Sequence, residues 1–153
     1  MSALTFSLKQ TPAQRLDLSP LVTQNLQGLS LAEISALELQ NGKAKRRVDQ
    51  VFEISGDDVQ NIVFNASSDK LDFIGKQLEG GSITVNGDAG AYLGLNMKSG
   101  SIVVNGNTGI YSGCEMKNGL IEIQGNAGDF LGGALPGNKQ GMKGGTILVK
   151  GNA

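Results

Sequence analysis

The stretch Ser99–Gly119, SGSIVVNGNTGIYSGCEMKNG, decides the fold because its pattern recurs along the chain at a step of 19 residues. Glycine accounts for 23 of the 153 residues and is concentrated from Gly80 onward. Three series of side chains follow the repeat: the isoleucines Ile83, Ile102, Ile121 and Ile147, the aromatics Tyr92, Tyr111 and Phe130, and the methionines Met97, Met116 and Met142. The last step is 26 residues, because seven residues around Pro136 are inserted there. A fixed period of this length is typical of solenoids, in which each repeat buries its apolar face against its neighbours.

Each repeat combines a short strand pattern with closely spaced glycines. The segment Ile121–Gln124 alternates apolar and polar residues, as a strand with one buried face does. Glycines at every third or fourth position exclude helical repeats. We therefore predict an all-β fold, a right-handed, single-stranded parallel β-helix of about four rungs of 19 residues. In that fold the three series of side chains form structural ladders.

The first part of the chain lacks this pattern. Ser30 and Glu33 have the spacing of a capping box, which predicts a short helix. We predict that residues 1–60 form a small N-terminal capping segment with short helices and that residues 61–153 form the β-helix repeats. The sequence stops at Gly151–Ala153, in the middle of a repeat, so we expect a C-terminal truncation.

Composition excludes several classes of function. The net charge is −1, which gives no basis for a nucleic-acid partner. With no histidine, Ser–His and Cys–His nucleophiles are excluded, and Cys114 is the single cysteine. The sequence has neither a signal peptide pattern nor a run of 18 apolar residues, so we expect a cytoplasmic protein without a membrane contact. We predict no catalytic residue, no cofactor-binding residue and no metal ligand in this chain.

Two features are candidates for contact with a partner. Lys98, Lys117 and Lys143 occupy equivalent repeat positions, with Glu79 at the foot of the column. The column is either a solvated stripe or a docking surface for an acidic partner. The insertion around Pro136 is either a passive loop or a partner contact, since insertions in solenoids often lie on the binding face.

Several motifs carry a resemblance to a known family. They are GDAGAYLG, GNTGIYSG, GNAGDFLGG with the following LPGNKQGMKGGTI, and the N-terminal LTFSLKQTPAQRLDLSPL. With these motifs the chain resembles the C subunit of the formylmethanofuran dehydrogenase and formyltransferase/hydrolase complexes over essentially its whole length. The C-terminal domain of glutamate synthase large subunits has similar glycine repeats. A glutamate-synthase-type β-helix spacer domain is therefore the alternative.

The resemblance implies a role in methanofuran- and tetrahydromethanopterin-linked one-carbon metabolism. In that family the archaeal dehydrogenase uses a molybdenum or tungsten pterin to make formylmethanofuran from carbon dioxide. The bacterial complex transfers a formyl group from a tetrahydromethanopterin carrier to a methanofuran-type carrier and releases formate. The resemblance implies that partner subunits of the A, B and D type hold these cofactors and active sites, and that this chain is a non-catalytic scaffold. A freestanding enzyme with a substrate groove along the coil is a further alternative.

Overall fold

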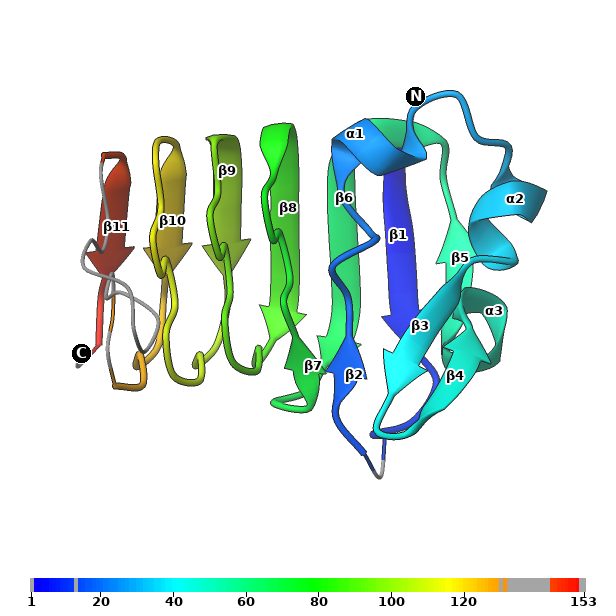
Figure 1. The fold of residues 1–153 in the computed structure, drawn as a ribbon, viewed down its shortest axis with the longest axis horizontal. Helices are drawn as coiled ribbons and strands as arrows, with labels where there is room; N and C mark the ends of the chain where they lie inside the picture. The colour runs from blue at the N-terminus through cyan, green and yellow to red at the C-terminus, as the bar shows by residue number, and fades with distance from the viewer. Residues whose placement is uncertain (1, 13, 130, 132–143, 152–153) are drawn as a thin grey trace.

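The structure, a computed structural model, describes residues 2–12, 14–129, 131 and 144–151. Within these residues the chain forms a seven-stranded sheet, a four-stranded sheet and three short helices. Figure 1 shows the large sheet running the length of the molecule, with the small sheet lying in front of its N-terminal half. The helices are α1 (Thr23–Leu26), α2 (Leu31–Ser35) and α3 (Val48–Val51).

The seven-stranded sheet joins the repeats to the first part of the chain. Its strand order is β11-β10-β9-β8-β6-β1-β5. All neighbours in it are parallel except β1 and β5, which are antiparallel. The strands are β1 (Ala3–Leu8), β5 (Phe52–Ser55), β6 (Asp58–Ser67), β8 (Glu79–Gly87), β9 (Ser99–Val104), β10 (Leu120–Ile123) and β11 (Thr146–Val149).

The four-stranded sheet has the order β4-β3-β2-β7, and only the pair β2 and β7 is parallel. Its strands are β2 (Leu16–Asp17), β3 (Glu38–Asn41), β4 (Ala44–Arg47) and β7 (Leu71–Asp72). The hairpin of β3 and β4 turns at Gly42 and Lys43. Since β2 belongs to the N-terminal part and β7 follows β6, this sheet fastens the first part of the chain to the start of the repeats.

Alternation of apolar and polar residues decides which face of the large sheet is buried. The register places Ile83 opposite Ile102, Ile102 opposite Ile121, and Ile121 opposite Ile147. The first three of these isoleucines are fully buried, and Ile147 in β11 is half-buried. The apolar faces of successive repeats therefore form one continuous row along the sheet.

A second part of the core lies under the N-terminal strands. Phe6 of β1 stacks on Phe64 of β6 with ring centroids 5.3 Å apart, and Phe52 meets Phe6 edge-on at 5.8 Å. All three rings are at most 1% exposed. The buried apolar residues of the first part of the chain and of the repeats belong to a single cluster.

The predicted fold class, an all-β right-handed parallel β-helix with about four rungs, is wrong. The structure is a mixed fold with two sheets that contain both parallel and antiparallel pairs, and with three short helices in the described residues. A parallel β-helix needs strands on more than one side of every circuit. Within the described residues, each repeat from β8 onward contributes one strand, to the large sheet, and the four-stranded sheet ends at β7.

The described return segments, between β8 and β9 and between β9 and β10, explain why no second strand forms there. Tyr92 and Tyr111 have φ values of 61° and 60°, and Gly94 and Gly113 have φ values of 67°. Alternating left-handed positions turn the backbone repeatedly and prevent the extended conformation that a strand requires. Successive return segments are still joined by backbone hydrogen bonds, such as the one from the Tyr92 N–H to the Ile110 carbonyl (2.9 Å).

Candidate interaction surfaces

Aromatic side chains stack along the return segments. The rings of Tyr92 and Tyr111 lie 5.3 Å apart and are nearly parallel, at 4°. Phe73 extends the stack, with its centroid 5.0 Å from that of Tyr92, and the Lys76 ammonium lies over the Phe73 ring. Sequence reasoning missed Phe73, although it lies 19 residues before Tyr92. Phe130, the third predicted member of the series, lies outside the described residues.

The stacked rings sit on strained backbone. Phe73, Tyr92 and Tyr111 all have φ close to 60°, the left-handed region that costs a bulky residue roughly 1–2 kcal/mol. Parallel stacking of half-buried rings recovers about 0.5–1.5 kcal/mol per pair. The stack therefore offsets much of the strain of the corner and has a structural role that needs no ligand.

The sulfur-containing side chains lie in the core. Met97, Met116 and Cys114 have no exposed surface, while Met142 lies outside the described residues. Burial, with a smaller contribution from the charge of Glu115, raises the pKa of the Cys114 thiol to about 11. At neutral pH the thiol is therefore protonated and inaccessible, which are the properties of an inert cysteine rather than a nucleophile.

The predicted lysine column is only partly within the described residues. Lys98 and Lys117 are both exposed, whereas Lys143 and Pro136 lie outside them. The Lys98 ammonium pairs with the Glu79 carboxylate at 3.0 Å, and both side chains are close to half exposed. An exposed pair of this kind adds little stability. It does reduce the positive charge at the foot of the column.

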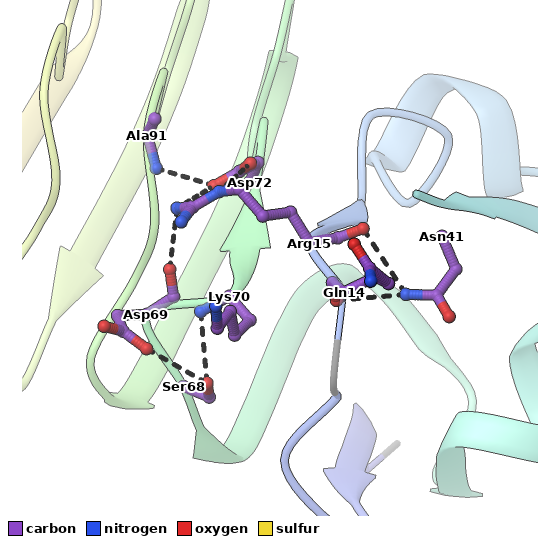
Figure 2. Close-up of polar contacts among 8 residues, drawn as sticks. All are labelled: Gln14, Arg15, Asn41, Ser68, Asp69, Lys70, Asp72 and Ala91. Atoms are coloured by element: carbon purple, nitrogen blue, oxygen red, sulfur yellow. Dashed lines mark hydrogen bonds and ion pairs between the residues drawn. The ribbon is translucent and has the colours of Figure 1, made fainter. Parts of the chain in front are cut away.

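A polar cluster joins the N-terminal part to the repeats at a largely buried carboxylate, that of Asp72 (Figure 2). Arg15, just before β2, forms a two-point ion pair with Asp72 of β7, through Nε (2.6 Å) and Nη2 (2.7 Å). Its Nη2 also donates to the Asp69 carbonyl (2.8 Å). The Ala91 backbone N–H donates to the same Asp72 carboxylate at 2.8 Å. One buried carboxylate thus connects three segments of the chain.

The electrostatics of this cluster favour the ion pair. Asp72 is 8% exposed, so its carboxylate depends on its hydrogen bonds for compensation. The hydrogen bond to Asp72 raises the pKa of the Arg15 guanidinium, and burial opposes that shift. Sequence reasoning missed both residues, because they lie far apart in the chain and neither belongs to a recognisable motif. Their contacts give them the function of holding the two parts of the chain together.

A cavity of about 720 Å³ opens beside the cluster. Its wall includes Arg15, Asp72, Asp88, Asn107 and Thr108. The Asp88 carboxylate accepts a hydrogen bond from the Asn107 N–H (2.9 Å), and the buried Thr108 hydroxyl has no hydrogen-bond partner in the described part of the chain. The side-chain oxygens of Asp88 and Asn107 in this wall each accept a backbone N–H of the following repeat. The cavity can receive a ligand, but it holds no nucleophile with an adjacent base.

Neither a metal site nor a membrane-spanning helix is found within residues that the structure describes. Groups of three potential ligands from His, Cys, Asp and Glu do not occur there. The described helices are too short and too polar to span a bilayer. The predicted lack of metal and cofactor sites stays a prediction.

Comparison with curated proteins finds relatives among the C subunits of two complexes. The C subunit of the tungsten-containing formylmethanofuran dehydrogenase 2 of Methanococcus maripaludis is 37% identical over 92 residues, 59% of this chain and 34% of that protein. The C subunit of the formyltransferase/hydrolase complex Fhc of Methylorubrum extorquens is 39% identical over 86 residues, 56% of this chain and 32% of that protein. The matched segment thus spans about a third of the length of these relatives. No protein-family model matches the chain.

Comparison with solved structures gives the same result over more of the chain. A chain in the crystal structure of the formyltransferase/hydrolase complex (FhcABCD) from Methylorubrum extorquens, in complex with methylofuran, superposes with a TM-score of 0.92. The sequence identity is 37%, and the superposition covers 96% of this chain and 56% of that chain. The predicted resemblance to the C subunits of these complexes is therefore confirmed.

Proposed function

We propose that this chain is a non-catalytic structural subunit of a formyltransferase/hydrolase or formylmethanofuran dehydrogenase complex. The observation that carries the proposal is the superposition of 96% of the chain, at 37% identity, on part of a chain from the FhcABCD crystal structure. Its partners would be subunits of the A, B and D type. Methanofuran-type and tetrahydromethanopterin carriers, and a molybdenum or tungsten pterin in the dehydrogenase form, would be used by those partners.

The chemistry of the described residues supports a structural role. The one cysteine, Cys114, is buried, and its pKa is raised to about 11. The Arg15–Asp72 pair links segments of the chain and is satisfied by its own contacts. Stacked apolar rows and internal hydrogen bonds therefore dominate the described part of the chain, and they give it a rigid surface for assembly.

The lysine column supplies a candidate docking surface for this role. Lys117 is exposed and makes no ion pair with any described residue, while Lys98 shares its charge with Glu79. The surface would dock against an acidic patch of a partner subunit. An acidic partner would compete with Glu79 for Lys98, which is possible because an exposed pair is weak.

The test is co-expression of this chain with subunits of the A, B and D type, followed by size-exclusion chromatography and a formyl-transfer assay. We expect one complex that carries the activity, and an isolated chain that is folded and inactive. Turnover by the isolated chain, or failure of the folded chain to join the complex, contradicts the proposal.

A charge-reversal experiment tests the lysine column separately. The variant Lys98→Glu/Lys117→Glu is expected to lose co-purification while keeping the circular dichroism and melting temperature of the native chain. The matched control Lys43→Glu/Lys45→Glu makes the same change in charge on the β3–β4 hairpin. If both variants assemble normally, the column is a solvated stripe.

A further inference from the structure

A second cleft lies in the N-terminal part of the chain, beside the β3–β4 hairpin. It has a volume of about 400 Å³. The segment that follows β1, including Lys9 and Thr11, forms one wall, and Arg46 of β4 with Gln50 of α3 forms part of the other. Leu16 and Val51, both buried, lie at the bottom of the cleft. The cleft is separate from the lysine column, whose described members do not line it.

The charged residues that line this cleft are all basic. Its lining includes two basic residues, Lys9 and Arg46, and no acidic residue. The nearby carboxylate of Asp49 pairs with Arg47 instead, at 2.9 Å. Arg46 makes no ion pair with any described residue. Because an unpaired guanidinium beside a concave surface attracts anions, the cleft has a preference for a negatively charged group.

The position of Arg46 on β4 (Ala44–Arg47) places it on the face that borders the cleft. In the antiparallel register Arg46 lies opposite Leu39, whose side chain is fully buried, and Lys45 lies opposite Gln40. Since side chains alternate along a strand, Arg46 lies on the face of β4 that borders the cleft and Lys45 on the other face. β4 is the edge strand of its sheet. An extended segment can therefore approach along this edge and place an acidic side chain next to Arg46.

The neutral lining favours a peptide over a free small anion. Gln10, Thr11 and Gln50 offer amide and hydroxyl groups that can hydrogen-bond to a peptide backbone. Gln50 Oε1 already accepts the Arg47 N–H at 2.8 Å, which leaves its amide N–H groups as donors. The volume of the cleft also lies in the usual range of ligand-binding pockets, so the cleft can hold more than a single anionic group.

We propose that this cleft binds a carboxylate presented by an extended, acidic protein segment, with Arg46 and Lys9 as the anion-binding residues. The proposal goes beyond the scaffold role and does not depend on it, because it concerns binding by the isolated chain. Lysine and other charges on edge strands also serve to block unwanted strand pairing. That role predicts no preference between acidic and neutral peptides, so the two explanations can be separated.

The experiment measures fluorescence anisotropy of the full chain with a labelled peptide that alternates glutamate and serine. A matched peptide with glutamine in place of glutamate serves as the uncharged probe. We expect the acidic peptide to bind, Arg46→Gln to weaken binding roughly tenfold, as expected for the loss of one charge-assisted hydrogen bond, and Lys9→Gln to weaken it less. Lys9 already donates to the Asp49 carbonyl (2.8 Å), so its contribution is shared.

Lys45→Gln is the matched control, because it removes the same charge from the other face of the same strand. Circular dichroism and thermal melting check that each variant is folded. Three results would overturn the proposal: equal binding of the two peptides, equal effects of Arg46→Gln and Lys45→Gln, or no binding of the acidic peptide at low salt. Inorganic phosphate and unlabelled peptide are also compared as competitors of the labelled peptide. If phosphate displaces the labelled peptide at the same concentration as the unlabelled peptide does, the assignment to a protein segment is overturned. Failure of the chain to assemble with A, B and D type subunits would leave these results unchanged.

Discussion

The stacked isoleucine row predicts a measurable coupling between Ile102 and Gly75. Ile102 is fully buried, and a Cβ added at Gly75 would lie 2.4 Å from the Ile102 Cδ1 atom. Ile102→Ala removes three carbon atoms, about 2.4 kcal/mol at roughly 0.8 kcal/mol for each. The cavity that remains adds to this loss, so we expect a decrease in unfolding free energy of about 3–4 kcal/mol.

Gly75→Ala is destabilising for two reasons that can be separated. Gly75 has a φ of 73°, which costs alanine roughly 1–2 kcal/mol, and the new methyl group collides with Ile102. The collision adds about 1–2 kcal/mol, because it forces the Ile102 side chain to shift in a packed core. In the double variant the collision disappears and only the backbone cost remains. The two changes together should therefore cost about 1–2 kcal/mol less than the sum of the single changes.

Urea denaturation followed by circular dichroism measures all three variants. Val103→Ala is the control, because Val103 is the next residue of β9 and is only half-buried, on the other face of the sheet. We expect it to cost less than half as much as Ile102→Ala. Additive effects of Gly75→Ala and Ile102→Ala, within about 0.5 kcal/mol, would refute the packing described for this row.

Two further predictions concern the polar cluster and the buried thiol. Asp72→Ala should lower the unfolding free energy by about 2 kcal/mol, because the buried Ala91 N–H loses its acceptor. Arg15→Gln should lower the unfolding free energy less than Asp72→Ala does, since half of the Arg15 side chain is exposed. A larger loss for Arg15→Gln than for Asp72→Ala in urea denaturation would contradict this account. Cys114 should resist alkylation by iodoacetamide in the folded chain. The stability that the neutral Cys114 thiol contributes should decline as the pH rises from the ordinary pKa of a thiol toward about 11, its pKa in the folded chain. Alkylation at the rate of the urea-unfolded chain, or a pH dependence unchanged in Cys114→Ala, would show that the thiol is not buried.

The sequence pattern predicted local structure better than fold class. Alternation in segments such as Ile121–Gln124 reflects strands with one buried face, and β10 covers most of that segment. The period did not show that return residues such as Tyr92 would take left-handed backbone positions instead of a second strand. It also could not show the antiparallel pairing of Phe6 with Ile54, since pairing between distant segments leaves no periodic signal. The fold class was therefore wrong, while the resemblance to the C subunits of the two complexes is confirmed.

For the candidate surfaces, too, the sequence pattern predicted positions along the chain and not the contacts between side chains. A column such as Lys98 and Lys117 is visible at a fixed step, but the ion pair of Lys98 with Glu79 depends on side-chain geometry. Arg15 and Asp72 are 57 residues apart, and their contact arises only when β2 pairs with β7. Contacts between the aperiodic first part of the chain and the repeats could not be predicted from the sequence alone.

The pairing of β1 with β6 has a consequence for how the chain folds during synthesis. Phe6 pairs with Phe64, 58 positions later, whereas neighbouring repeats pair across 19. The longer loop costs about 1 kcal/mol more in closure entropy than a single repeat does. During synthesis β1 must therefore wait for β6, with Leu4, Phe6 and Leu8 not yet covered by that strand. An apolar strand left exposed for that interval is a site at which incomplete chains can associate.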